Sequence, residues 1–231
     1  MNFVLVLTIT AILSGAGISK ETSSNVLPTL EEQMFDFGHM GIDYTVYCQF
    51  AFENRTDDTI RIQRAIANCD CGNVSSLDSI ISPDDTAHFQ LRFKTKDLFG
   101  PTNRSFTVIT DHPDLDTLEF HYLSIVGQWF NGLRPEPAAI MFLPKKTTET
   151  VRIPNRSFDS ISLLDIIQYD SSFTITATVD KAGKGSDLVL EITPRPDITK
   201  GTYMTNATLL IGTDEDSDPT ILTIPIKIVR Y

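Results

Sequence analysis

Residues 35–71, FDFGHMGIDYTVYCQFAFENRTDDTIRIQRAIANCDC, contain the pattern that decides the fold. From residue 43 onward apolar and polar side chains alternate, which is the period of a half-buried β-strand. The inward row comprises Val46, Cys48, Phe50 and Phe52. Turn-forming residues follow at 54–58 (NRTDD), and the alternation restarts at Ile60. The stretch therefore predicts a strand, a turn and a second strand, without deciding whether the two strands pair or lie in opposite sheets.

Further strands follow at the spacing of a β-sandwich. Residues 87–93 (AHFQLRF) alternate throughout, and residues 105–110 and 118–126 supply two more strands. Turn-forming segments separate them at residues 83–85 and 111–114. About seven short strands joined by turns are typical of an immunoglobulin-like sandwich. No amphipathic helix of useful length lies between them, which argues against α/β folds.

The second half of the chain repeats the first. Residues 54–60 (NRTDDTI) correspond to residues 155–161 (NRSFDSI), and Gly100 corresponds to Gly201 at the same offset. A period near one hundred residues is a whole domain, because solenoid repeats span about 20 to 50 residues. The sequence therefore predicts an all-β protein of two tandem immunoglobulin-like β-sandwich domains.

We place the first domain at residues 33–130 and the second at residues 138–231. The linker between them, residues 131–137 (NGLRPEP), contains two prolines, which favour an extended and fairly stiff connector. Trp129 and Phe130 precede the linker. We expect them either to pack between the domains or to end the core of the first domain.

The last predicted strand contains a proline. Its inward row comprises Leu222, Ile224, Ile226 and Ile228, and Pro225 falls on the outward row. Proline cannot donate a hydrogen bond to a neighbouring strand. We therefore expect this strand to lie at a sheet edge or to be bulged at Pro225.

The N-terminus has the pattern of a secretion signal. Residues 1–16, MNFVLVLTITAILSGA, carry no charged side chain and end in small residues, with cleavage expected near Gly17. The apolar run is shorter than the roughly 20 residues that a membrane-spanning helix needs. We therefore predict a signal peptide at 1–16, a polar linker at 17–32, and an exported protein in the periplasm, the cell envelope or the extracellular space. An uncleaved segment that tethers the chain to the membrane is the alternative.

The overall charge bears on the choice of partner. Thirty acidic and nineteen basic residues give a formal net charge of −11 over the 231 residues. A protein that binds a polyanion is expected to carry a clustered basic face instead. The composition therefore argues against nucleic acid as a partner.

Four segments resemble a known bacterial family. They are FDFG at residues 35–38, FAFEN at 50–54, the Cys69/Cys71 pair, and ISPDD at 81–85. Residues 33–127 thereby resemble the domain of unknown function 1573, which is allied to immunoglobulin-like modules of the ASPM, SPD-2 and hydin type. Residues 136–231 look like the second, more divergent sandwich often found after such a module. The resemblance implies an exported immunoglobulin-like domain and no established activity.

Cys69 and Cys71 are the residues whose spacing suggests chemistry. Two thiols two positions apart on an extended chain point the same way, so they could hold a soft ion such as Cu(I) or act as a redox pair. A structural zinc site needs a second pair of ligands, which the sequence lacks. In an oxidising compartment the alternatives are a disulfide between the two, or a disulfide to Cys48. A disulfide, a metal role and unpaired thiols all remain open at this point.

The remaining candidate residues have ordinary explanations. His88 and His121 fall on outward rows and His112 in a turn, where solvent-facing positions are expected. The acidic segment 214–218 (DEDSD) lacks the spacing of a calcium loop, so we expect a solvated turn. Five Asn-x-Ser/Thr sequons lie in or near turns, at Asn54, Asn73, Asn103, Asn155 and Asn206. In a bacterial protein we expect them to be products of turn composition.

No catalytic motif accompanies these residues. The sequence lacks a nucleophile elbow, a phosphate-binding loop, a dinucleotide fingerprint and a His-Glu-x-x-His helix. We therefore predict no enzyme activity and no cofactor. The predicted function is a non-catalytic exported binding or scaffolding protein, whose partner is a protein or a cell-envelope component. The alternative is a metal-handling or thiol redox protein that uses Cys69 and Cys71.

Overall fold

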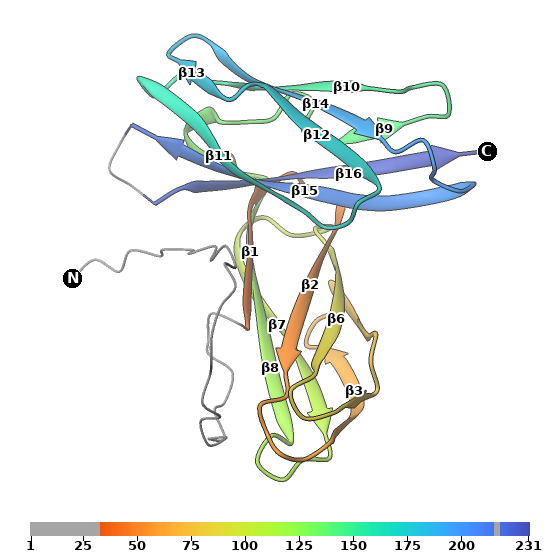
Figure 1. Cartoon of the computed structure of the whole chain (residues 1–231). Helices are drawn as coiled ribbons and strands as arrows, with labels where there is room; N and C mark the ends of the chain where they lie inside the picture. Colours follow the sequence, from red (N-terminus) through yellow and green to blue (C-terminus); the bar gives the residue numbers. More distant parts are fainter. Residues whose placement is uncertain (1–32, 215–217) are drawn as a thin grey trace, which may run out of the picture.

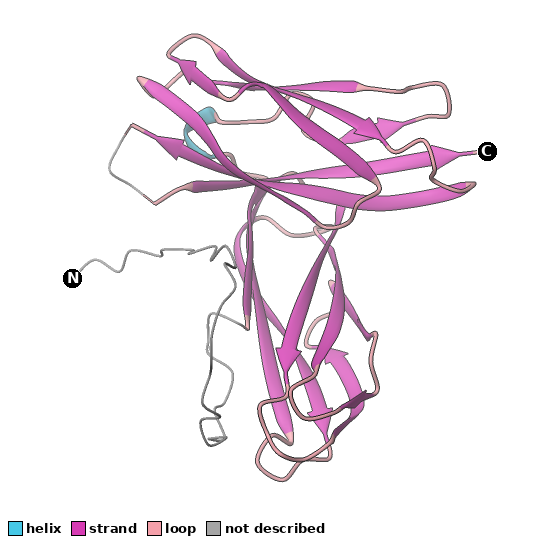
Figure 2. Ribbon diagram, viewed as in Figure 1, coloured by secondary structure: helices cyan, strands magenta, loops and turns pink. Residues whose placement is uncertain are grey.

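The computed structural model describes residues 33–214 and 218–231 (Figure 1). The predicted signal peptide, the predicted linker at 17–32 and the middle of the acidic segment 214–218 lie outside these residues. The described chain consists of strands and turns, with a short 3₁₀ turn, η1 (Phe130–Gly132), as its only helical element (Figure 2). The prediction of an all-β fold of the immunoglobulin-like sandwich class is confirmed.

Buried apolar side chains form two separate clusters. One is built from residues between 37 and 126, and the other from residues between 133 and 228. We call the parts of the chain around these clusters the N-terminal lobe and the C-terminal lobe; they are the lower and upper halves of Figure 1. The exact domain boundaries drawn from the sequence stay a prediction.

The N-terminal lobe has two facing layers of strands. The first layer is antiparallel, in the order β2 (Thr45–Glu53), β6 (Thr86–Lys94) and β4 (Gly72–Ser76). The second layer has the order β1 (Met34–Met40), β8 (Thr117–Val126), β7 (Gly100–Thr110), β3 (Ile60–Ala67) and β5 (Ile80–Ile81). The strands before and after the turn at 54–58 therefore lie in opposite sheets. The sequence had left this point open.

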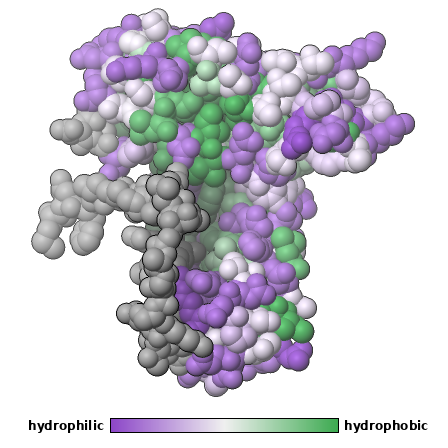
Figure 3. Space-filling model, in the orientation of Figure 1, coloured by the Kyte–Doolittle hydropathy of each residue, from purple (hydrophilic) through white to green (hydrophobic). Residues whose placement is uncertain are grey.

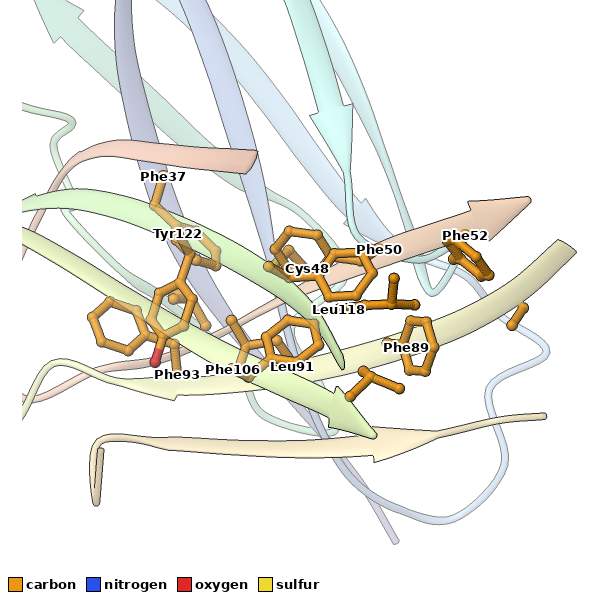
Figure 4. Close-up of a cluster of buried hydrophobic side chains, with 14 of the residues drawn as sticks. Phe37, Cys48, Phe50, Phe52, Phe89, Leu91, Phe93, Phe106, Leu118 and Tyr122 are labelled. Atoms are coloured by element: carbon orange, nitrogen blue, oxygen red, sulfur yellow. The ribbon is translucent and has the colours of Figure 1, made fainter. Parts of the chain in front are cut away.

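Aromatic rings fill the space between these layers. The inward row of β2, which the alternation predicted, is buried at all four positions. Phe50 lies 5.0 Å from Phe106 between ring centroids (Figure 4). Phe106 in turn stacks on Phe120 at 4.9 Å. Such pairs stabilise the core beyond the burial of their area, by about 0.5–1.5 kcal/mol each.

The C-terminal lobe repeats the two-layer arrangement. One layer has the order β10 (Glu149–Pro154), β14 (Asp187–Pro194) and β12 (Phe173–Val179). The other has the order β13 (Lys181–Gly183), β11 (Ser160–Gln168), β15 (Gly201–Thr213) and β16 (Thr220–Arg230), and β9 (Ile140–Phe142) pairs with β16 in parallel. β7 and β15 begin at Gly100 and Gly201, the two glycines that the sequence repeat aligns.

Strand β1 joins the two lobes. It pairs in parallel with β8 along most of its length and with β16 at His39 and Leu222. The Thr223 hydroxyl donates to the carbonyl of Phe37 at 2.6 Å. Gly38 has φ +61°, and a Cβ built there would lie 2.1 Å from the carbonyl oxygen of Ile221. A glycine is therefore required at this crossing, because it permits both the backbone angle and the close approach.

The turns aligned by the sequence repeat are built alike. The Asn54 side chain donates to the carbonyl of Ile81, and the Asn155 side chain donates to that of Ala182, in both cases 27 residues further on. The backbone N–H of each asparagine donates to a residue 31 positions later, Asp85 or Ser186. Both asparagine side chains are 0% exposed. The prediction that this turn belongs to the fold agrees with these contacts.

The expectation of an edge strand at Pro225 is wrong. β16 pairs with β15 along its whole length and has two further partners on its opposite edge, β1 at Leu222 and β9 from Ile226 onward. Pro225 falls between these two partners. At this position β16 needs no backbone donor toward β1 or β9. The strand therefore accommodates a proline, which lacks the N–H, although it lies inside the sheet.

The segment predicted as a linker packs on the C-terminal lobe. Leu133 is fully buried in that lobe's core, and Glu136 exchanges two backbone hydrogen bonds with Arg152, at 2.7 and 3.0 Å. Trp129 also packs against the C-terminal core. The ring of Phe130 lies 5.9 Å from that of Phe158 and 5.9 Å from that of His39 on β1. Phe130 thus contacts both lobes, and neither aromatic ends the N-terminal core.

Candidate functional site

Cys69 and Cys71 lie in the turn between β3 and β4 and are joined in a disulfide. The sheets hold both sides of this turn. The N–H of Asn68 donates to the carbonyl of Ser105 at 3.0 Å, and the N–H of Lys94 donates to the carbonyl of Cys71 at 2.8 Å. Both cysteines are partly exposed, and Asp70 between them is exposed. The structure therefore brings the two predicted residues together at the surface.

Tyr122 lies beneath this disulfide. Its hydroxyl oxygen is 3.4 Å from the Sγ of Cys69, and since a disulfide sulfur carries no hydrogen, the tyrosine is the donor. The Tyr122 side chain is 0% exposed, and burial raises its pKa to about 12, against the opposing effect of the Arg104 guanidinium. A Cβ on Gly72 would lie 2.7 Å from the Tyr122 hydroxyl. The glycine after the cysteine pair thus leaves the space that the hydroxyl occupies.

Cys48 takes no part in this pair. It is a free thiol on the inward row of β2, 2% exposed, and lies among the rings of the N-terminal core (Figure 4). Burial raises the pKa of the Cys48 thiol well above its usual value. A thiol that stays protonated is a poor nucleophile and a poor metal ligand, so Cys48 acts as a small apolar core residue.

The histidines do not gather into a site. His88 and His121 are partly exposed on their strands, as expected. The expectation is wrong for His112, which is 6% exposed, accepts a hydrogen bond from the N–H of Asp114 at 3.3 Å, and lies 4.0 Å from the Asp58 carboxylate. The turn between β7 and β8 folds this ring inward, which a turn composition alone does not reveal. Within residues 33–214 and 218–231, no three His, Cys, Asp or Glu side chains lie close enough to hold a metal ion.

A polar and aromatic contact holds β2 against the C-terminal lobe. The backbone N–H of Tyr47 donates to the side-chain oxygen of Asn206 at 2.6 Å, and Asn206 is 2% exposed. The rings of Tyr47 and Tyr169 lie 5.2 Å apart, and the side chain of Gln90 donates to the Tyr169 hydroxyl. Burial raises the pKa of Tyr169 to about 12. The lobes are thus joined by side chains as well as by β1.

A hollow of about 250 Å³ lies between the lobes. We call it the interlobe groove; its lining comprises Asp43, Tyr44, Thr45, Ala139, Ile140, Met141, Met204, Pro225, Ile226 and Lys227. Met141 and Met204 are 51% and 36% exposed. β9 forms part of one wall and pairs with β16 along one edge, and no other described strand pairs with its opposite edge. The groove therefore presents two exposed thioether side chains, and β9 in its wall has one edge that no other described strand pairs with.

A second apolar surface lies on the outer face of the C-terminal lobe. Figure 3 shows hydrophobic side chains gathered in the region where β11 pairs with β15. Leu164 and Ile167 on β11 are 56% and 40% exposed, and Leu164 packs over Gly212 of β15. Leu164 lines neither the interlobe groove nor a second, smaller hollow of about 130 Å³ whose lining includes Ile167.

None of the helical turns within the described residues is long and apolar enough to cross a membrane. The fold and these surfaces place the protein in the class of all-β proteins with immunoglobulin-like sandwiches. Within that class, residues 28–121 match a family described as "Protein of unknown function (DUF1573)". The match covers less than half of the chain and spans most of the N-terminal lobe. Comparison with curated proteins finds no match.

Several solved structures resemble the chain at low sequence identity. SSP-19 of Caenorhabditis elegans, an MSP-domain protein like family member, is 14% identical with a TM-score of 0.34, covering 42% of this chain and 99% of its own. A protein of unknown function from Porphyromonas gingivalis is 9% identical with a TM-score of 0.33, covering 83% and 95%. The CupB2 chaperone of Pseudomonas aeruginosa is 9% identical with a TM-score of 0.31, covering 80% and 95%. Similarities at this level say nothing about activity.

Sequence reasoning missed Tyr122 and the interlobe groove. Tyr122 falls on the inward row of β8, together with Leu118 and Phe120. A buried tyrosine hydroxyl usually has a hydrogen-bond partner. The alternating pattern of this strand could therefore have predicted a polar contact at Tyr122. The groove had no such signal, because its walls come from segments about 100 and 160 residues apart, as Thr45, Met141 and Met204 show.

Proposed function

We propose that the protein is an exported, non-catalytic binding protein, and that its interlobe groove binds an extended apolar segment of a partner protein. The observation that carries the proposal is the pair of exposed methionines, Met141 and Met204, in a groove of about 250 Å³ between the two lobes. Flexible and polarisable thioethers suit a surface that accepts apolar side chains of varied shape. The match of the N-terminal lobe to a family without assigned activity is compatible with this proposal.

The strand edge of β9 favours an extended segment over a helix. An extended segment can add to a free strand edge by backbone hydrogen bonds, while adjacent hollows take its alternate side chains. Asp43 and Lys227 contribute one charge of each sign to the groove lining. The lining therefore gives no reason to expect a strongly charged segment.

Peptide display tests the binding proposal. A library of random heptapeptides is selected against the immobilised chain that begins at residue 17, and enriched peptides are titrated by fluorescence anisotropy. We expect apolar sequences, and we expect Met141→Lys to weaken their binding at least about tenfold, because a charged ammonium group would have to be desolvated in the groove. Leu164→Lys is the matched control, since it places the same charge on an exposed apolar position of β11 that does not line the groove.

Two results would contradict the groove as the binding site. One is a selection that yields no peptide above background. The other is a set of peptides whose affinity falls with Leu164→Lys and not with Met141→Lys, which would place binding on β11.

The proposed export rests on residues 1–16 alone. Expression of the full chain in a bacterial host, followed by cell fractionation and measurement of the intact mass, tests it. We expect the exported protein to lack the first sixteen residues. Retention of the full mass in the cytoplasm would contradict export, and retention of the full mass in the membrane fraction would favour the tether.

A further inference from the structure

We propose that Cys69 and Cys71 form a redox-active disulfide that exchanges with a dithiol of a partner protein, with Cys69 as the leaving sulfur. This inference goes beyond the proposed peptide binding and does not depend on the interlobe groove. It rests on three features of the turn between β3 and β4. These are the single residue between the cysteines, their partial exposure, and the hydroxyl group that is hydrogen-bonded to the Sγ of Cys69.

The short separation argues against a structural role for this disulfide. A disulfide stabilises a protein mainly by restricting the unfolded chain, and this effect grows with the length of the closed loop. Cys69 and Cys71 are separated by two positions in the sequence, so the closed loop contains one intervening residue, Asp70. The flanks of the turn are already held by Asn68 and Cys71 through hydrogen bonds to β7 and β6. The fold therefore depends little on the disulfide and can keep its shape when the bond is reduced.

The surroundings of the two sulfurs differ, and this difference assigns their roles. The Tyr122 hydroxyl donates to the Sγ of Cys69 at 3.4 Å. If the sulfur–sulfur bond breaks with the electron pair on Cys69, the resulting thiolate keeps this donor, and a hydrogen bond to a charged acceptor is stronger than one to a neutral acceptor. A better stabilised leaving thiolate departs faster. Attack is therefore expected at Cys71, and Gly72 leaves the space in which Tyr122 can remain during the reaction.

The exchange balances with a partner dithiol as the reductant. A thiolate of the partner attacks the Sγ of Cys71, a mixed disulfide forms, and the Cys69–Cys71 bond breaks with its electron pair on Cys69. The second partner thiolate then attacks the partner's own sulfur in the mixed disulfide and releases Cys71 as a thiolate. The partner ends with one disulfide, and this protein ends with two thiols after uptake of two protons. The reverse sequence oxidises this protein and reduces the partner's disulfide.

Equilibration with glutathione measures whether the bond is redox-active. The chain that begins at residue 17 is incubated at several ratios of reduced to oxidised glutathione, then alkylated and weighed by mass spectrometry. We expect the form with two alkylated thiols to increase steadily with the ratio, while Cys48 stays unmodified because it is buried. A disulfide that stays fully oxidised in excess reduced glutathione would overturn the proposal.

Tyr122→Phe tests the role of the hydroxyl. We expect the rate of reduction by dithiothreitol to fall roughly tenfold, the size of effect that one hydrogen bond to a charged group supports. Tyr169→Phe is the matched control, because it removes a hydroxyl that is also hydrogen-bonded and partly buried but that contacts Gln90 and no disulfide sulfur. Equal rates in the parent protein and Tyr122→Phe would overturn the assigned direction of exchange.

The pH dependence of Cys69 alkylation distinguishes stabilisation of the thiolate by the Tyr122 hydroxyl from a purely structural role of that hydroxyl. In the Cys71→Ser variant the Cys69 thiol is free to react, and its rate of alkylation by iodoacetamide follows the thiolate fraction. Adding Tyr122→Phe to this variant is expected to shift the profile to higher pH, since the thiolate loses its donor. A general loosening of the fold would instead raise the alkylation of Cys48. An unshifted Cys69 profile would overturn the proposal.

Discussion

At the scale of single residues, two buried asparagines organise the chain. The Asn54 side chain donates to the carbonyls of Asp58 and Ile81, at 2.8 and 3.0 Å, and accepts from both the N–H and the hydroxyl of Thr56. Asn155 donates to Ala182 and accepts from the N–H of Phe158. Because each amide satisfies backbone groups on both sides of a turn, an apolar residue of similar size could not replace it.

Replacement of Asn54 by alanine is expected to destabilise the protein by about 2–4 kcal/mol, because the buried carbonyl of Ile81 would lose its side-chain donor and the buried N–H and hydroxyl of Thr56 would lose their acceptor. Asn155→Ala is expected to cost less, since fewer hydrogen bonds would be lost. The measurement is the free energy of unfolding in urea. Asn103→Ala, at an exposed position of β7, is the control and is expected to change the stability by less than about 0.5 kcal/mol. A loss for Asn54→Ala no larger than that of this control would contradict the assignment.

At the scale of elements, β1 does most to fix the arrangement of the strands. It has β8 on one side and β16 on the other, both in parallel, so that one sheet passes from the N-terminal lobe to the C-terminal lobe. The crossing depends on Gly38, where the backbone of Ile221 lies in the place of a side chain. A substitution there therefore acts on the sheet that connects the lobes.

Gly38→Ala is expected to destabilise the protein by about 2–5 kcal/mol, from the cost of a positive φ angle together with the clash. Gly132→Ala is the matched control, because Gly132 has φ +80° and nothing within 4 Å of the added Cβ. Gly132→Ala should lower the free energy of unfolding only by the cost of holding alanine at a positive φ angle, about 1–2 kcal/mol. The difference between their free energies of unfolding measures the contact with Ile221. Equal losses in the two variants would show that β16 moves away without cost.

The sequence predicted the strands that alternate and missed those that do not. β2 and β6 have a strict period of two, and their buried rows agree with the prediction. β1, β4 and β5 are short or irregular, and the bulge in β1 between Asp36 and His39 breaks the period. Pro225 was misjudged because its neighbours, β1 and β9, come from distant parts of the chain.

For the candidate sites, spacing singled out Cys69 and Cys71, whereas Tyr122 and the interlobe groove depend on contacts between distant segments.

At the scale of the whole molecule, the described structure has two cores and one junction. The junction consists of β1, the contact of Tyr47 with Asn206, the tyrosine pair Tyr47 and Tyr169, and Phe130 beside His39. Both walls of the interlobe groove depend on this junction, since Thr45 comes from one lobe and Met141 from the other. The distance between the two walls of the groove is therefore set by the contacts of the junction.

Unfolding experiments can measure how strongly the junction couples the lobes. Trp129, the only tryptophan, packs on the C-terminal core, so its fluorescence reports on that lobe. Hydrogen exchange of the amides in β6 reports on the N-terminal lobe. In the parent protein we expect both signals to change at the same urea concentration, because the shared sheet and the Tyr47–Asn206 hydrogen bond favour a single cooperative transition.

Combining Gly38→Ala with Asn206→Ala removes the backbone contact and the buried side-chain acceptor together. We expect the two transitions to separate, since the coupling between the lobes falls while most of each core is unchanged. The affinity of peptides for the interlobe groove should fall in the same variant, because its two walls are no longer held at a fixed distance. Two separate transitions in the parent protein would show that the lobes are not coupled. A single transition that persists in the double variant would show that the remaining contacts are enough to couple the lobes; these are Phe130, the Tyr47–Tyr169 pair, and the hydrogen bonds of Gln90 and Thr223.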